Sequence, residues 1–123
     1  MTITELMAIR NAIPADSKEG KIQTRYKIAK LLKETEADEI FYRSEFSKII
    51  KEYAMKNEDG SVATDENGNI PLNPETKDEF AQKMKELEET KVKTPTVSFT
   101  IDELDVFELS AADLIVLDSV ITE

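Results

Sequence analysis

The sequence predicts a mostly helical α+β fold, in which a long antiparallel helical pair carries a small β-hairpin at its tip and a C-terminal helix folds back. Three observations predict it. Residues 21–56 contain neither Pro nor Gly and are rich in helix formers. An Asn-Gly pair at 67–68 lies between two short β-competent runs, which is a strong local signal for a hairpin. Apolar residues recur with helical spacing in the segment that follows, up to residue 93.

One domain is expected for 123 residues. Its parts are an N-terminal helix and linker over 1–20, the helical pair with the hairpin over 21–93, and a short strand with the C-terminal helix over 94–123. The first helix is predicted over 3–13, with Thr2 or Thr4 as N-cap and Pro14 ending it.

The long helix is predicted from an apolar stripe that recurs at broadly helical intervals through residues 21–56. Its members are Ile22, Tyr26, Ala29, Leu32, Ile40, Phe46, Ile50 and Tyr53. The stripe gives way to charged residues near 35–38, so a break there is the alternative to one continuous helix.

The predicted hairpin covers residues 61–72, with Pro71 at an unpaired edge or at the end of its strand. Asn73 as cap and Pro74 at the first helical position then open a second helix. Its narrow apolar stripe, Phe80, Met84 and Leu87, suits packing against the long helix.

The C-terminal part begins with period-two alternation at Val97, Phe99 and Ile101, which predicts a short strand. Thr100 and Glu103 have capping-box spacing, and Ser110 opens a last helix with Leu114, Leu117 and Ile121 on one face. We expect the apolar residues between 104 and 121 to be buried, by folding back on the first helix and the near end of the helical pair.

Charge is segregated along the chain, which has a formal net charge of -10. Residues 1–33 hold seven bases and three acids, whereas residues 102–123 hold seven acids and no base. One interpretation is that the basic and acidic parts pack near each other in the fold. The other is that one of them faces a charged partner.

The composition excludes several chemistries. Without Cys or His the chain has no thiol nucleophile, no disulfide and none of the commonest general bases or metal ligands. Asp65, Asn67 and Asn69 alternate as in a calcium loop, but Ile70 and Thr76 occupy its glycine and glutamate positions. We therefore expect no catalytic residue, no cofactor and no metal, and the lack of long apolar runs or a signal pattern predicts a cytosolic protein.

Two groups of residues are predicted to contact a partner, although ordinary solvated surface is the alternative for both. The first comprises the bases Arg25, Lys27 and Lys30 of the basic stretch 21–33, and the second comprises the tip residues Asp65, Glu66, Asn67 and Gly68. Direct binding of nucleic acid by the basic stretch is opposed by the net charge. The same acidity is compatible with a protein that imitates nucleic acid.

Five short sequences form one pattern over residues 20–123. They are Lys21 and Arg25 followed by Leu31-Leu32, Lys51-Glu52-Tyr53-Ala54, Asp65-Glu66-Asn67-Gly68, the segment 99–104 and the apolar segment 111–121. In this pattern the chain resembles a family of small, uncharacterised proteins of tailed phages and prophages of Gram-positive bacteria. The resemblance implies a phage origin and a non-enzymatic role, and it brings no catalytic residue with it.

The function expected from these observations is a phage-encoded protein-binding module. It would act as a virion or tail-assembly accessory, or as an inhibitor of a host protein such as a defence protein. Its partner would be a phage structural protein or a host protein, in the bacterial cytoplasm or the virion, and a homo-oligomer is a further option. The alternative is an acidic nucleic-acid mimic or a nucleic-acid-binding protein. Salt-sensitive binding to DNA, or competition with it, separates the two classes.

Overall fold

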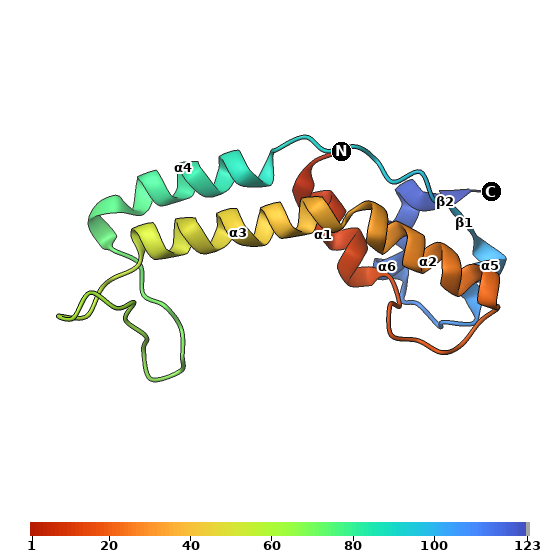
Figure 1. Cartoon of the computed structure of the whole chain (residues 1–123), viewed down its shortest axis with the longest axis horizontal. Helices are drawn as coiled ribbons and strands as arrows, with labels where there is room; N and C mark the ends of the chain where they lie inside the picture. Colours follow the sequence, from red (N-terminus) through yellow and green to blue (C-terminus); the bar gives the residue numbers. More distant parts are fainter. Residues whose placement is uncertain (123) are drawn as a thin grey trace. The chain divides into compact units, whose positions relative to one another are not determined.

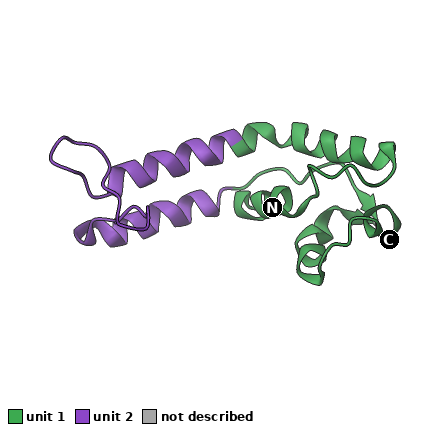
Figure 2. Cartoon of the chain, turned by 90° about the horizontal axis from the view of Figure 1, so that it is seen from below, with its two compact units in different colours: residues 1–39, 91–123 green, residues 40–90 purple. Residues whose placement is uncertain are grey.

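The computed structural model describes residues 1–122, which divide into two compact units. Unit 1 comprises residues 1–39 and 91–123, and unit 2 comprises residues 40–90 (Figure 2). The described residues form six α-helices, two short 3-10 helices and one two-stranded sheet. The predicted α+β, mostly helical class is therefore confirmed.

Helix α1 (Ile3–Ala12) opens unit 1 (Figure 1). Its N-cap is Thr2, one of the two predicted caps: the Glu5 amide donates to Thr2 Oγ1 at 3.2 Å, and the Thr2 amide donates to Glu5 Oε1 at 3.2 Å. These bonds satisfy two amides at the helix start that have no partner within the helix. They also hold the pKa of Glu5 below its ordinary value, the Thr2 backbone bond being the largest cause.

The predicted long helix is two helices, α2 (Ile22–Glu34) and α3 (Glu36–Tyr53), separated at Thr35. Thr35 Oγ1 donates to the Leu31 carbonyl at 2.8 Å, a local bond of the kind that bends helices. Arg10 from α1 donates to the Leu32 carbonyl at 2.8 Å and forms an ion pair with Glu39. The interruption lies in the 35–38 region, as in the alternative prediction, and Arg10 is bound across it.

The predicted apolar face of α2 is wrong. Ile22, Tyr26 and Ala29 are exposed, and the buried residues are Thr24, Ile28 and Leu31. The Thr24 hydroxyl donates to Glu103 at 3.4 Å, so this polar residue can occupy the inner face. The helix is rotated relative to the prediction, and this rotation leaves two large apolar side chains in solvent.

The C-terminal part of unit 1 contains α5 (Ile101–Asp105), α6 (Ala111–Leu117) and the 3-10 turn η2 (Asp118–Val120). Capping boxes begin both helices, at Thr100 with Glu103 and at Ser110 with Asp113. The predicted strand is only two residues long: β1 (Phe99–Thr100) pairs in parallel with β2 (Ile121–Thr122). A parallel pair needs a crossover, which α5 and α6 provide.

The core of unit 1 joins these elements. Helix α6 packs on α1, as predicted for the C-terminal helix. The buried cluster draws on α1, α2, β1, α5, α6 and η2, and its members are Ile9, Ile13, Ile28, Leu31, Phe99, Leu104, Leu117 and Val120.

Unit 2 is built on α3, from Ile40 onward, and α4 (Lys77–Glu88), which lie side by side in Figure 1. Asn73 caps the preceding 3-10 turn η1 (Pro74–Thr76) by accepting from the Glu75 amide at 3.0 Å, as predicted. Near the end of α3 the Tyr53 ring meets the Phe80 ring of α4 edge-on, with centroids 6.1 Å apart. Ile49, Tyr53 and Leu87 form the buried cluster of this unit.

The predicted β-hairpin over 61–72 is wrong. Its two flanks do not pair with each other, because the chain that follows α3 takes the hydrogen bonds of both. The Ala63 amide donates to the Met55 carbonyl at 2.9 Å, and the Met55 amide donates to the Pro71 carbonyl at 2.9 Å. Isolated bridges Ala54–Leu72 and Lys56–Val62 complete this pairing. The turn at 65–68 forms as expected: the Gly68 amide donates to the Asp65 carbonyl at 3.0 Å, and the Asp65 amide donates to the Asn69 carbonyl at 2.8 Å.

The turn at 65–68 allows a matched test of how locally this loop is stabilised. Gly68 has φ +80° and open space where a Cβ would lie, whereas at Gly20 (φ +84°) a Cβ would meet the Phe107 ring at 3.0 Å. Gly68→Val is expected to loosen residues 61–72 and leave the thermal midpoint of unit 1 unchanged. Gly20→Ala should lower that midpoint, because a side chain at this positive φ strains the backbone of unit 1 and its Cβ also crowds the Phe107 ring. Thermal denaturation with hydrogen exchange checks both, and an equal loss in the two variants would contradict this account.

Candidate functional site

The exposed side of α2 is the most distinctive surface of unit 1. Ile22 is 73% exposed and Tyr26 is 54% exposed, although both are large and apolar. Cations flank them on the same helix. We call this surface the α2 face, and it consists of the exposed residues Ile22, Arg25, Tyr26, Lys30 and Lys33.

Helical spacing explains why these residues share a side. Positions 22, 26, 30 and 33 recur at intervals of four, four and three, which places them in one row along the helix. Within the row, Lys30 Nζ lies 5.5 Å from the centroid of the Tyr26 ring, in the range of a cation–π contact. The ring is thereby held beside a cation and still presents surface to solvent.

Lys27 differs from Arg25 and Lys30, with which it was predicted to contact a partner. Its Nζ lies 2.9 Å from Glu103 Oε1 and 6.0 Å from the centroid of the Phe99 ring. Glu103 also accepts from the Thr100 amide at 3.0 Å. The Lys27 bond is the largest cause that holds the pKa of Glu103 below its ordinary value. Lys27 thus joins the basic helix to the acidic C-terminal segment, as one of the two charge interpretations requires.

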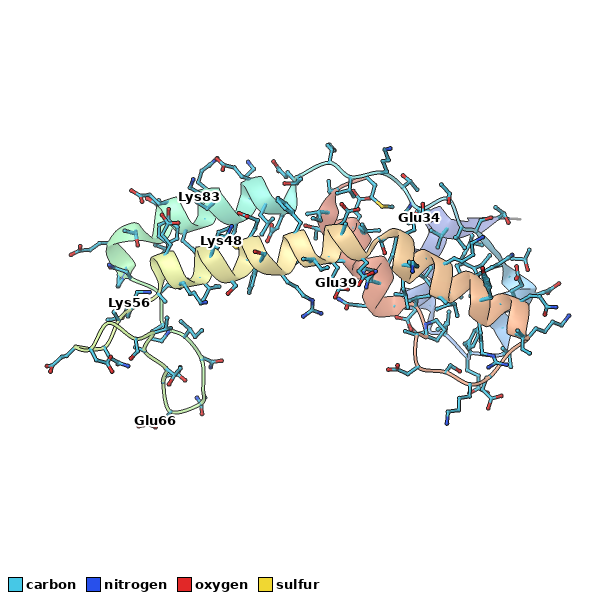
Figure 3. All side chains as sticks on the ribbon, in the orientation of Figure 1. Glu34, Glu39, Lys48, Lys56, Glu66 and Lys83 are labelled. Carbon is cyan, nitrogen blue, oxygen red and sulfur yellow. The ribbon has the colours of Figure 1, made fainter. Side chains whose placement is uncertain are left out.

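A shallow depression of about 640 Å³ lies along one edge of the α2 face. Glu34 and Thr96 are both part of its lining and are bonded to each other: the Glu34 carboxylate accepts from the Thr96 amide at 2.8 Å and from Thr96 Oγ1 at 3.1 Å. Glu34 is labelled in Figure 3. The lining residues are Tyr26, Lys27, Lys30, Lys33, Glu34, Thr96, Val97 and Ser98. This lining contains one aromatic ring and three cations, one of which, Lys27, is already paired with Glu103.

The second predicted group, residues 65–68, belongs to unit 2 and is exposed throughout. Asp65 Oδ1 accepts from the Asn67 amide at 2.9 Å and from the Asn69 amide at 2.8 Å, so this carboxylate is used in forming the turn. Glu66 lies at the end of the loop in Figure 3. The structure therefore offers the side chains of Glu66 and Asn67 for contact, and it gives Asp65 and Gly68 a conformational role.

Metal-binding geometry is not found within residues 1–122, where no group of three or more Asp or Glu residues is arranged to hold an ion. None of the helices described combines the length and apolar content needed to cross a bilayer.

A second exposed apolar surface was missed from the sequence. Of the apolar face predicted for this helix, Leu117 is fully buried and Ile121 packs against the core, whereas Ile115 is 77% exposed and Val116, Ala111 and Ala112 are also in solvent. We call these four exposed residues the α6 face. Positions 115 and 116 lie outside the predicted face of Leu114, Leu117 and Ile121, so helical spacing alone already indicated that they are not on the buried side.

Comparisons with protein-family models, with curated protein sequences and with solved structures found no match to this chain. The surfaces of the molecule itself therefore have to indicate its function.

Proposed function

We propose that the protein is a phage-encoded, non-enzymatic protein-binding module whose principal contact surface is the α2 face. The observation that carries the proposal is the exposure of Ile22 and Tyr26 in a row of cations. Its role would be that of a virion or tail-assembly accessory, or of an inhibitor of a host protein such as a defence protein. It would act in the host cytoplasm or in the virion.

The physical reason lies in what this surface gains on binding. Covering an exposed Ile and Tyr recovers about 25 cal/mol for each Å² of apolar area removed from water. Tyr and Arg are the residue types that most often dominate protein interfaces, whereas isolated surface Lys residues contribute little. The cations Arg25, Lys30 and Lys33 favour a partner with an acidic surface and steer its approach.

The exposed turn of unit 2 is a second contact in this proposal, through Glu66 and Asn67. Both side chains are in solvent, and in the turn that presents them the Asn67 and Asn69 amides donate to the Asp65 carboxylate. A loop tip of this kind can contact a partner without any change in the helices.

Affinity purification from infected cells tests the proposal with matched variants. Tyr26→Ser and Lys30→Glu should each reduce recovery of the co-purifying protein, the former by roughly 30-fold if Tyr26 is a hot spot worth about 2 kcal/mol. Lys85→Glu, the same charge change at an exposed position of α4, should leave recovery unchanged. Equal recovery with all three variants would contradict a role for the α2 face.

Nucleic-acid binding is the second candidate, and the depression beside Tyr26 is the observation that favours it. In proteins that bind single-stranded nucleic acid, bases stack on aromatic rings and phosphates contact neighbouring cations. The net charge of -10 opposes the approach of a polyanion, so we expect no mobility shift of single or double strands at physiological salt. A tight, salt-dependent shift that Lys30→Glu abolishes would replace the first proposal with this one.

A further inference from the structure

The α2 face and the α6 face are complementary in character. Both expose apolar side chains, Ile22 and Tyr26 on one and Ile115 and Val116 on the other. They differ in charge: the α2 face carries three cations, whereas α6 and the 3-10 turn that follows it hold the acids Asp113 and Asp118 and no base. Asp118 is an exposed acid in the turn that follows α6.

The two faces cannot meet within one chain. Ile28 and Leu31 of α2 and Leu117 of α6 belong to the same buried cluster, so each helix turns its inner side to that core and its exposed side away from it. Figure 2 shows the two helices on opposite edges of unit 1. Contact between the α2 face and an α6 face therefore requires a second copy of the protein.

We propose that the α6 face of one copy docks on the α2 face of another. The inference rests on the proposed function, because it assigns the occupant of the same α2 face. Ile115 and Val116 would cover Ile22 and Tyr26, and Asp118 would lie against the cations Arg25, Lys30 and Lys33. Removing two sets of exposed apolar side chains from water drives the contact, and the opposite charges fix which faces meet.

Such a contact joins two different surfaces, so it is heterologous. Each pair of copies leaves one α2 face and one α6 face free, and the assembly grows into a ring or an open chain. The net charge of each copy opposes association at low ionic strength. At physiological salt this repulsion is screened beyond roughly 8 Å, while the short-range contact between opposite charges remains.

Complementary half-variants test the inference with purified protein. Ile115→Glu spoils the α6 face and leaves the α2 face intact, whereas Tyr26→Ser with Lys30→Glu does the opposite. All three positions are exposed, so the substitutions should leave folding unchanged. Circular dichroism tests whether each variant keeps the helical content of the wild type. Sedimentation velocity should show concentration-dependent oligomers for the wild type and a 13.9 kDa monomer for each half-variant alone.

The mixture of the two half-variants gives the decisive result. One supplies the only intact α2 face and the other the only intact α6 face, so the mixture should form a one-to-one dimer and grow no further. Lys85→Glu should assemble like the wild type. A wild type that stays monomeric at every concentration overturns the inference, as does an oligomer that both half-variants retain.

These outcomes are separable from a failure of the proposed function. A monomeric wild type whose α2 face still recovers a different protein from infected cells refutes self-docking alone. If the α2 variants change neither the oligomeric state nor that recovery, both proposals fail.

Discussion

Replacing Leu117 by Ala is expected to lower the free energy of unfolding by about 2–5 kcal/mol, the cost of a cavity in a packed core. Leu117 is fully buried in the cluster that joins α1, α2 and β1 to the C-terminal elements. Total stabilities of domains are about 5–15 kcal/mol, so the loss should be plain in thermal or denaturant unfolding. Deleting residues 104–123 removes Leu104, Leu117 and Val120 together, and it should abolish the cooperative transition or cause aggregation.

Ile115→Ala is the control for this prediction, because the two residues lie two positions apart in α6. Ile115 is exposed, so its truncation should change stability by no more than about 0.5 kcal/mol. Equal effects at 115 and 117 would mean that α6 does not turn Leu117 toward the core and Ile115 toward solvent.

Replacing Arg10 by Met is expected to cost about 1–3 kcal/mol, since it leaves hydrogen-bond acceptors and a carboxylate without their cation. Arg10 binds the Leu32 carbonyl, the Thr35 hydroxyl and Glu39, and its side chain is only 13% exposed. Denaturant unfolding measures the loss. Hydrogen exchange should also quicken around Thr35, where α2 gives way to α3.

Lys48→Met is the matched control for Arg10. Lys48 pairs with Glu45 at 3.2 Å three residues away, but this pair is exposed on α3. Exposed ion pairs contribute roughly 0–1 kcal/mol, so the change should be small. If both substitutions cost the same, Arg10 does not stabilise the junction.

Local signals in the sequence predicted the local structure well. The cap at Thr2, the caps at Asn73, Thr100 and Ser110, and the turn at 65–68 each depend on a few neighbouring side chains. Such signals are readable because the hydrogen bonds that satisfy them are made within about four residues.

The predictions that were wrong concern the buried face of α2 and the hairpin, both of which depend on contacts with other parts of the chain. The inner face of α2 includes Thr24, whose hydroxyl is satisfied by Glu103, seventy-nine positions away. Such a bond cannot be anticipated from the periodicity of apolar residues. The hairpin prediction was wrong because the residues that follow Tyr53 form backbone hydrogen bonds with both flanks of the turn. Of the predicted contact residues, Arg25 and Lys30 are exposed on the α2 face, whereas Lys27 and Asp65 serve the fold.

Photo-crosslinking from position 26 tests the central claim, that the α2 face is a protein-binding surface. A photoreactive phenylalanine analogue would replace Tyr26 in cells that make the protein in its native setting, with position 85 on α4 as the control. We predict a crosslinked protein adduct from position 26 that Lys30→Glu removes, and none from position 85. Equal adducts from both positions, or adducts with nucleic acid alone, would contradict the claim.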